Sequence, residues 1–402
     1  MNDRLQATVL DATRFIPAGL RTEVATLLQQ VLGSTSMPAV AAATERSSAE
    51  SAPPLNHQPT SFTAPSAGTG ARSFLERLNG NGFKAGLGGL AKSFPAPAAE
   101  PVPDGAVFLA GSYSNQAGSR AYKLYVPSGA HGQMLPLVVM LHGCTQSPDD
   151  FAAGTRMNAL AEEHTCLVVY PAQTSAGNPS KCWNWFSPGD QQREQGEPSL
   201  IAGITRQIMR DYPVDPQRVY VAGLSAGGAA AAIMGATYPD LYAAIGVHSG
   251  LAVGAASDMP SAFAAMQGGA TVSAPKGGAA AEGPQRIVPT IVFHGDQDTT
   301  VHPRNGDQVI AQARGTSTPA LQATATAQQG QVPGGRAYRR TLHADAHGQA
   351  ILEQWVIHGA GHAWSGGSQA GSYTDPQGPD ATREMLRFFL AHRHPAAAPS
   401  VH

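Results

Sequence analysis

Ser225 stands in a setting that is typical of a catalytic nucleophile. An apolar run at 219–222 predicts a strand, the pattern Gly-x-Ser-x-Gly covers 223–227, and the small residues at 229–232 suit a helix. A sharp turn between such a strand and helix exposes the serine hydroxyl above the edge of a sheet. The N-terminus of the following helix favours negative charge there. We therefore predict that Ser225 acts as the nucleophile of a hydrolase.

An activated serine also needs a histidine base and an acid that orients the base. Two acids follow the predicted strand at 290–293, and we choose Asp298 because it lies deeper in the loop, whereas Asp296 is expected to stabilise the loop itself. Two histidines follow the predicted strand that ends at 357, and His362 is preferred because His358 still lies at the strand end. Serine, aspartate and histidine in this chain order are typical of the α/β-hydrolase fold.

Backbone amides must also bind the oxyanion that forms when a serine attacks an ester. One donor is expected from Ala226, the residue after the nucleophile, and the second from the loop after the apolar run at 135–141. Cys144 in that loop is the natural second donor through its N–H, and its thiol need not react.

The segments that carry these residues alternate between strands and helices. Strands are expected at 106–111, 120–126, 135–141, 167–170, 218–222, 241–247, 289–293 and 350–357, and helices at 157–164, 198–212 and 382–392. The first two strands suit an antiparallel hairpin, and the continuous apolar runs suit strands that are covered on both faces. The sequence therefore predicts an α/β fold, with a mostly parallel sheet, helices on both faces, and active groups at the carboxyl ends of the strands.

Composition divides the chain into a globular body and low-complexity segments. Residues 1–33 carry an amphipathic helical pattern, 34–103 are predicted to be a largely disordered linker, and 104–395 form the predicted catalytic domain, followed by a tail at 396–402. Two stretches rich in small residues, 251–286 and 315–336, are expected as insertions in that domain. The first is either a mobile lid over the cleft or a disordered insertion.

Charge and hydropathy exclude several kinds of partner. The net charge of −2 gives no general attraction for nucleic acid or for an anionic membrane. No apolar run approaches the ~20 residues of a transmembrane segment. No continuous apolar signal segment is visible near the N-terminus, so we expect a cytoplasmic protein, with secretion as the alternative. Three cysteines are too few for a disulfide framework, and the oligomeric state is left open.

Aromatic side chains near the predicted site are candidates for substrate binding. Trp183, Trp185 and Trp364 are expected to line a cleft for an apolar acyl chain, with ordinary loop packing as the alternative. The run from His343 to His347 has some metal-ligand character, but no matched ligand set accompanies it. We therefore expect no metal ion and no cofactor.

Five short motifs make residues from about 105 to 392 similar to one esterase family. This family is built on the catalytic domain of poly(3-hydroxybutyrate) depolymerases, and its pattern also covers some feruloyl and acetylxylan esterases. The motifs are His-Gly-Cys-Thr-Gln at 142–146, Cys-Trp-Asn-Trp-Phe at 182–186, Gly-Leu-Ser-Ala-Gly-Gly at 223–228, His-Gly-Asp-Gln-Asp at 294–298 and Gly-His-Ala-Trp at 361–364. The resemblance implies an α/β-hydrolase fold, ester hydrolysis through an acyl-enzyme, and no cofactor.

The resemblance also implies roles for individual residues. The triad chosen above matches the catalytic residues of the family, and Cys144 matches its oxyanion residue. The family further implies a disulfide between Cys144 and Cys182, which would leave Cys166 as a buried free thiol.

We expect a serine esterase that hydrolyses a short-chain polyhydroxyalkanoate, meaning poly(3-hydroxybutyrate) or its oligomers. A carbohydrate esterase that removes feruloyl or acetyl groups is the first alternative. The second is a non-catalytic protein on a retained hydrolase fold, held at the surface of a polymer granule by its N-terminal helix. That helix and the linker after it resemble the intracellular members of the family.

Overall fold

The computed structural model describes residues 102–268, 287–315, 325–345 and 347–395. The predicted helix within 1–33, nearly all of the predicted linker at 34–103 and the predicted tail at 396–402 lie outside the described residues. The same holds for parts of the two predicted insertions, at 269–286 and 316–324.

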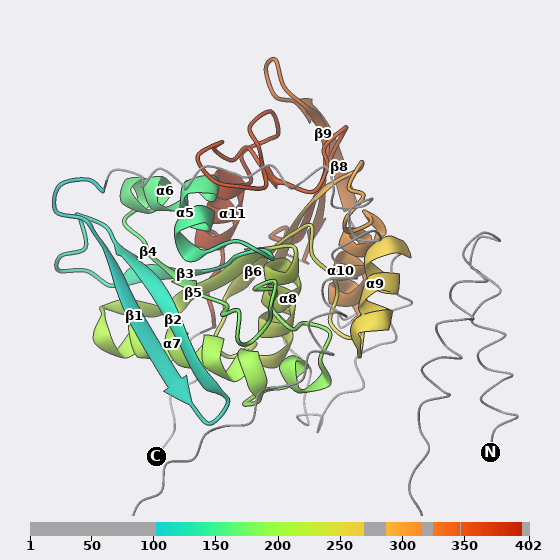
Figure 1. Cartoon of the computed structure of the whole chain (residues 1–402). Coiled ribbons are helices and arrows are strands. Elements are labelled where there is room, and N and C mark those ends of the chain that lie inside the picture. Colours follow the sequence, from blue (N-terminus) through green and yellow to red (C-terminus); the bar gives the residue numbers. More distant parts are fainter. Residues whose placement is uncertain (1–101, 269–286, 316–324, 346, 396–402) are drawn as a thin grey trace, which may run out of the picture. The chain divides into compact units, whose positions relative to one another are not determined.

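A ten-stranded sheet runs through the described residues in the order β1-β2-β4-β3-β5-β6-β7-β10-β9-β8 (Figure 1). Its strands are β1 Val107–Asn115, β2 Gly118–Val126, β3 Leu135–Leu141, β4 Leu167–Pro171, β5 Val214–Leu224, β6 Ala244–His248, β7 Thr290–Gly295, β8 Ala325–Gln331, β9 Ala337–Ala344 and β10 Ala350–Ile357. The central strands from β4 to β10 are parallel, whereas the outer strands extend both sides antiparallel. The predicted mostly parallel sheet is therefore confirmed.

Helices cover both faces of this sheet (Figure 1). They are α5 Pro148–Thr155, α6 Met157–His164, α7 Gly196–Asp211, α8 Ala226–Thr237, α9 Met259–Gly268, α10 Arg304–Gly315 and α11 Ala381–Leu390. In β3, Val139 packs into the cluster of α7 and α8, whereas Val138 and Met140 pack into the cluster of α5, α6 and α11. Every residue of β3 is buried, as expected for a parallel strand between two helical layers.

The sequence patterns locate the central elements but miss several others. All eight predicted strands are present within a few residues, and β1 and β2 form the predicted antiparallel hairpin. The patterns do not predict α5, α9 or α10. These helices are short or carry few apolar residues, so their periodicity is weak.

The two stretches expected as insertions contain regular structure where they are described. In 315–336, the strand β8 pairs antiparallel with β9 at the edge of the sheet. Six of the seven β8 residues are exposed, and its Ala, Gln and Gly residues give no alternation of apolar and polar side chains for a sequence pattern to detect. In 251–286, the helix α9 packs through Ala262 and Ala265, which are buried.

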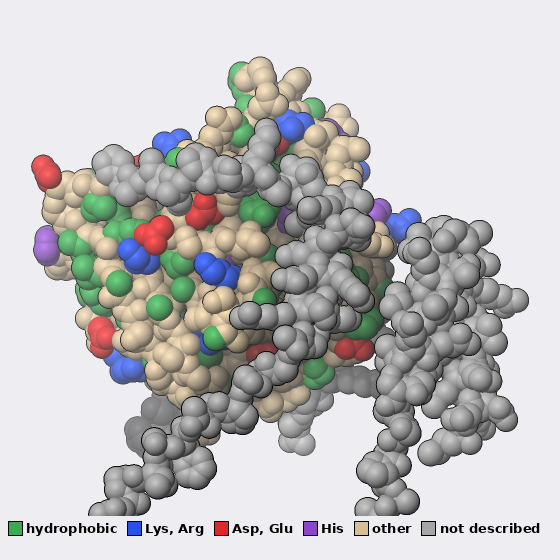
Figure 2. Space-filling view, viewed as in Figure 1, with side chains coloured by type: hydrophobic (Ala, Val, Ile, Leu, Met, Phe, Trp, Pro, Cys, Tyr) green, Lys and Arg blue, Asp and Glu red, His purple; other side chains and the backbone are tan. Residues whose placement is uncertain are grey.

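Charged side chains are scattered on the face of the molecule shown in Figure 2, where no large patch of one sign is visible. A surface of this kind gives no strong electrostatic attraction for a highly charged partner on that face. Within the described ranges, none of the helices is long and apolar enough to cross a lipid bilayer.

Candidate active site

Ser225 occupies the sharp turn between β5 and α8. Its backbone has φ 58° and ψ −120°, a strained conformation for a residue with a Cβ. A Cβ added to Gly223 would lie 2.3 Å from the carbonyl carbon of Gly227, and one added to Gly227 would lie 2.0 Å from the Leu141 oxygen. The turn can therefore form only with glycine at both positions, which explains the Gly-x-Ser-x-Gly pattern.

The neighbouring strand β6 holds the backbone of the nucleophile in place. The Ser225 N–H donates to the carbonyl oxygen of His248, at 2.9 Å. The His248 ring stacks on Trp364, with centroids 5.0 Å apart, and its Nε2 accepts a hydrogen bond from the Ser365 N–H. One residue at the end of β6 therefore links the nucleophile to the segment that follows His362.

Asp298 and His362 are brought together as predicted. The Asp298 Oδ2 lies 2.7 Å from the His362 Nδ1. The other oxygen, Oδ1, accepts the backbone N–H groups of Thr300 and Val301, at 2.9 and 2.8 Å. The Asp298 side chain is fully buried, whereas His362 is partly exposed. The pair therefore joins a buried carboxylate to an imidazole that can be reached from the surface.

The charge state of Asp298 follows from its partners. Burial raises the pKa of Asp298, but hydrogen bonds from His294 and His362 outweigh burial and lower the pKa below its usual range. The His294 Nε2 lies 3.4 Å from Asp298 Oδ2 and donates to the Val301 carbonyl at 2.8 Å. An ionised Asp298 holds the proton of His362 on Nδ1, which leaves Nε2 to accept a proton from a nucleophile.

Ser225 lies at the same edge of the sheet as Asp298 and His362. These residues follow β5, β7 and β10, which are parallel, so that their carboxyl ends coincide. In the part of the chain that the structure describes, no hydrogen bond joins Ser225 Oγ to His362 Nε2. Catalytic hydrogen bonds of hydrolases without substrate are often long and tighten on binding. The catalytic roles of the three residues stay a prediction.

Asp296 and His358 form a separate pair. Asp296 Oδ2 lies 2.9 Å from His358 Nδ1, and Oδ1 accepts the Gly359 N–H at 2.7 Å. Asp296 therefore ties its own loop to the end of β10. These two bonds reach the loop after β10, whereas the sequence predicts that Asp296 stabilises its own loop.

The loop after β3 offers one unused backbone donor beside the nucleophile. The N–H groups of Gly143, Thr145 and Gln146 are bonded to Gln146 Oε1, Ser180 O and Gly143 O. Among the described residues, the Cys144 N–H has no protein acceptor. The Ala226 N–H is the first amide of α8, where a helix leaves donors unpaired. These two amides are the ones predicted for the oxyanion hole.

The cysteines have the states that the resemblance implies. Cys144 and Cys182 form a disulfide, and Cys166 is a buried free thiol. Burial raises the pKa of the Cys166 thiol to about 12, so it stays protonated at neutral pH. The disulfide ties the Cys144 loop to the Cys-Trp-Asn-Trp-Phe segment.

Two of the three tryptophans expected in the substrate cleft do not line one. The side chains of Trp183 and Trp364 are buried, with exposed fractions of 0% and 1%. The Trp183 Nε1 donates to the His142 carbonyl oxygen, and the Trp364 Nε1 donates to Thr382 Oγ1. Both indoles act as internal packing groups because each N–H finds a buried acceptor.

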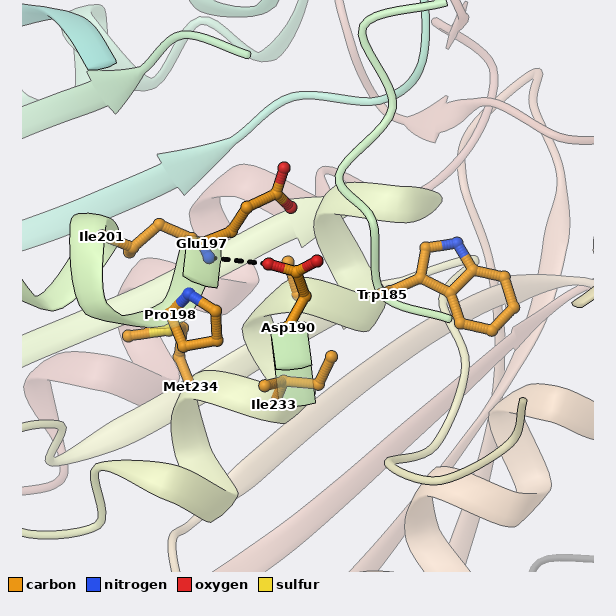
Figure 3. Close-up of a pocket in the computed structure, with 8 residues that line it drawn as sticks. Trp185, Asp190, Glu197, Pro198, Ile201, Ile233 and Met234 are labelled. Carbon is orange, nitrogen blue, oxygen red and sulfur yellow. Dashed lines mark hydrogen bonds between the residues drawn. The ribbon is translucent and has the colours of Figure 1, made fainter. Parts of the chain in front are cut away.

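Trp185 is the tryptophan of this set that borders a cavity. It lines a small pocket between α7 and α8 (Figure 3), together with Asp190, Glu197, Pro198, Ile201, Ala230, Ile233 and Met234. The Glu197 N–H donates to Asp190 Oδ1 at its edge. The wall is otherwise mostly apolar, and a role of Trp185 in substrate binding stays a prediction.

The run from His343 to His347 is the part of the sequence with some metal-ligand character. The described residues contain no group of three or more His, Cys, Asp or Glu side chains that could hold a metal ion. His343 of the metal-like run is buried in β9.

A strained serine after β5, an aspartate after β7 and a histidine after β10 on a mostly parallel sheet define an α/β-hydrolase. A family model described as Esterase PHB depolymerase matches residues 120–333, more than half of the chain. The chain therefore belongs to the PHB depolymerase family of esterases.

Individual relatives fall into two groups by name. Poly(3-hydroxyalkanoate) depolymerase C of Paucimonas lemoignei is 34% identical over 283 residues, which cover 67% of this chain and 65% of the relative. Feruloyl esterase B of Neurospora crassa is 34% identical over 152 residues, which cover 37% of this chain and 50% of the relative. A probable acetylxylan esterase A of Aspergillus clavatus is 29% identical over 195 residues, 45% of this chain and 61% of the relative. The chain thus spans less than two thirds of the length of these relatives.

A solved structure supports the fold. An acetyl xylan esterase from Aspergillus awamori aligns with a TM-score of 0.51 at 21% sequence identity, covering 68% of this chain and 94% of that one. At this identity the likeness establishes the α/β-hydrolase fold.

Proposed function

We propose that this protein is a serine carboxylic-ester hydrolase. The observation that carries the proposal is the buried Asp298–His362 pair at the same sheet edge as the strained Ser225. An imidazole oriented by an ionised carboxylate is the base that a serine hydroxyl needs at neutral pH.

The proposed reaction has two halves. His362 Nε2 takes the proton of Ser225 Oγ as this oxygen bonds to the ester carbonyl carbon, and the amides of Cys144 and Ala226 stabilise the oxyanion. The ester C–O bond then breaks, and His362 returns the proton to the leaving alcohol. Water next attacks the acyl-enzyme with His362 as base, which releases the acid and restores the serine. Asp298 stabilises the imidazolium in both halves.

The proposed substrate is a short-chain polyhydroxyalkanoate or its oligomers. The family description and the relative named as a poly(3-hydroxyalkanoate) depolymerase support this substrate. The relatives named as acetylxylan and feruloyl esterases support a carbohydrate ester as the second candidate.

Replacement of the nucleophile tests the catalytic proposal. Ser225→Ala should lower the turnover of a short-chain p-nitrophenyl ester by roughly 10³-fold or more, because the covalent route is lost. Ser114→Ala, in the exposed hairpin of β1 and β2, is the matched control and should keep full activity. Near-normal activity of Ser225→Ala would reject the assignment. Failure of the wild type to react with a serine-directed phosphonate would favour the non-catalytic alternative.

A substrate panel separates the two candidate substrates. Purified protein is given 3-hydroxybutyrate oligomers, poly(3-hydroxybutyrate) particles, acetylated xylan and methyl ferulate, and the sizes of the products are resolved. Faster release of hydroxyacids than of acetate or ferulate supports the polyester proposal, and the reverse order rejects it. A chain lacking residues 1–95 tests attachment to the polymer, because unchanged partition onto the particles would contradict a binding role for this segment.

A further inference from the structure

His142 is a buried histidine beside the active site that the proposed reaction does not use. It follows β3 directly and has an exposed fraction of 1%. Its Nδ1 lies 2.7 Å from the carbonyl oxygen of Gly143, and its Nε2 accepts the backbone N–H of Gln173 at 3.0 Å. Trp183 packs against the ring and donates its Nε1–H to the His142 carbonyl oxygen. Both ring nitrogens are therefore engaged by backbone groups.

These contacts determine which ring nitrogen carries the proton. A backbone N–H can only donate, so Nε2 of His142 is unprotonated. A carbonyl oxygen can only accept, so Nδ1 carries the hydrogen and donates it to Gly143. Burial also lowers the pKa of His142 to about 4, so the ring is neutral at physiological pH.

The accepting oxygen belongs to the peptide group that contains the expected oxyanion donor. The Gly143 carbonyl and the Cys144 N–H are the two ends of one planar trans peptide and point in opposite directions. Holding the oxygen on one side therefore determines where the N–H points on the other. The Gln146 N–H reaches the same oxygen at 3.3 Å, a longer contact than that of His142.

This peptide group lies against the nucleophile. A Cβ added to Gly143 would come within 3.6 Å of the Ser225 Cβ and 3.5 Å of the Leu224 oxygen. The Gly143 N–H is held by Gln146 Oε1 at 2.9 Å, so rotation of the preceding peptide is also restricted. The Cys144 N–H is the amide that these contacts leave for a ligand.

We propose that His142 is a positioning residue, which aims the Cys144 N–H at the oxyanion by holding the Gly143 carbonyl through Nδ1–H. This inference rests on the proposed serine esterase function and deepens it. His142 does not touch the substrate, and its effect passes through one peptide group. Because the oxyanion forms only during attack, loss of this contact should weaken transition-state binding more than substrate binding.

Three substitutions separate the hydrogen-bond donor function of His142 from its size. In His142→Asn the side-chain NH₂ lies near the place of Nδ1 and can still donate to Gly143. In His142→Gln the polar end lies near the place of Nε2, so it can meet Gln173 but not Gly143. His142→Leu removes both functions while filling much of the space. Each variant is assayed for kcat and KM, for thermal unfolding, and for inhibition by a trifluoromethyl ketone that mimics the tetrahedral oxyanion.

We expect the loss of kcat to depend on whether the new side chain can donate a hydrogen bond to the Gly143 carbonyl. His142→Gln and His142→Leu should lower kcat by about 10- to 100-fold with little change in KM, and should weaken trifluoromethyl ketone binding by a similar factor. His142→Asn should stay within about threefold of the wild type. Equal losses in Asn and Gln variants, or ketone binding that stays unchanged while kcat falls, would overturn the proposal.

A second buried histidine provides the control for general destabilisation. The Nδ1 of His392 lies 2.7 Å from the Phe388 carbonyl oxygen at the end of α11, and its Nε2 lies 2.9 Å from the Ala350 carbonyl oxygen. His392→Leu should lower the unfolding temperature without a selective loss of kcat or of ketone binding. If the wild type neither hydrolyses esters nor binds the ketone, the proposed function fails and the role of His142 fails with it. If the wild type is active and His142→Leu behaves like His392→Leu, only the role of His142 is rejected.

Discussion

Two aspartate–histidine pairs stand next to each other at the carboxyl edge of the sheet, and they differ mainly in burial. Asp298 and His362 are 2.7 Å apart, with side-chain exposures of 0% and 10%. Asp296 and His358 are 2.9 Å apart, with exposures of 31% and 46%. The same two residue types at nearly the same distance therefore occur in two electrostatic environments. An exposed pair is screened by water and contributes little, whereas a buried pair interacts strongly.

The surroundings of the two carboxylates reinforce this difference. Asp298 accepts bonds from two backbone amides and lies close to two histidines, His362 and His294. Asp296 bonds to one histidine and one backbone amide, both in the loop after β10. The comparison teaches that burial and backbone donors, rather than the presence of an Asp–His pair, mark the catalytic candidate.

Replacing each aspartate by asparagine is the most direct way to break the comparison. Asp298→Asn should lower kcat by roughly 10³- to 10⁴-fold, because the amide favours the wrong tautomer of His362. Asp296→Asn, the matched control in the same loop, should change kcat by less than about threefold. Esterase assays on both variants check this. If kcat falls equally in the two variants, burial does not distinguish the catalytic aspartate from Asp296.

Replacing His294, the second histidine beside Asp298, sharpens the comparison. His294→Leu should lower kcat by about 10-fold, because Asp298 loses one of the groups that hold its Oδ2 in place. The loss should be smaller than that of Asp298→Asn, since His362 and two amides still hold the carboxylate. A kcat of His294→Leu equal to that of the wild type would show that these remaining contacts suffice.

The smallest expected effect is on the pH dependence of the free energy of unfolding. The folded pKa of Asp298 is lowered, so unfolded chains bind a proton below about pH 4 that folded chains do not. The free energy of unfolding should therefore fall as the pH drops from 5 to 3, and this fall should be smaller in Asp298→Asn. Urea unfolding at both pH values measures it. The effect of Asp296→Asn should be weaker, because its carboxylate is partly exposed. The same fall in wild type and Asp298→Asn would contradict a lowered pKa of Asp298 in the folded protein.

The central strands could be predicted from the sequence because their apolar runs are continuous. A strand such as β3, which is buried on both faces, needs apolar residues at every position, and this requirement is visible in the residues themselves. The edge strand β8 could not be found in this way. Its exposed side chains pair through the backbone with β9, and backbone pairing leaves no pattern in the sequence.

The candidate site likewise contains some residues that the sequence identifies and others that it does not. Ser225, Asp298 and His362 could be chosen from residue type and position after predicted strands. The tryptophans could not be assigned, because an indole beside the site either faces substrate or packs inside. The structure shows that Trp183 donates to the buried His142 carbonyl oxygen and Trp364 to the buried Thr382 hydroxyl. The sequence also gives no indication of the hydrogen bonds of His142, because it shows only that this residue precedes Gly143.

The sequence by itself determined the chemistry that this chain offers: a serine between two glycines, an acid and a base after later strands, and a parallel sheet to align them. These features follow from local rules of backbone geometry and hydrophobic pattern. Only the tertiary structure decided which Asp–His pair is buried, which amide is free to bind an oxyanion, and which aromatic rings are enclosed. Burial and hydrogen-bond partners depend on segments that are distant in the chain, such as Gln173 against His142.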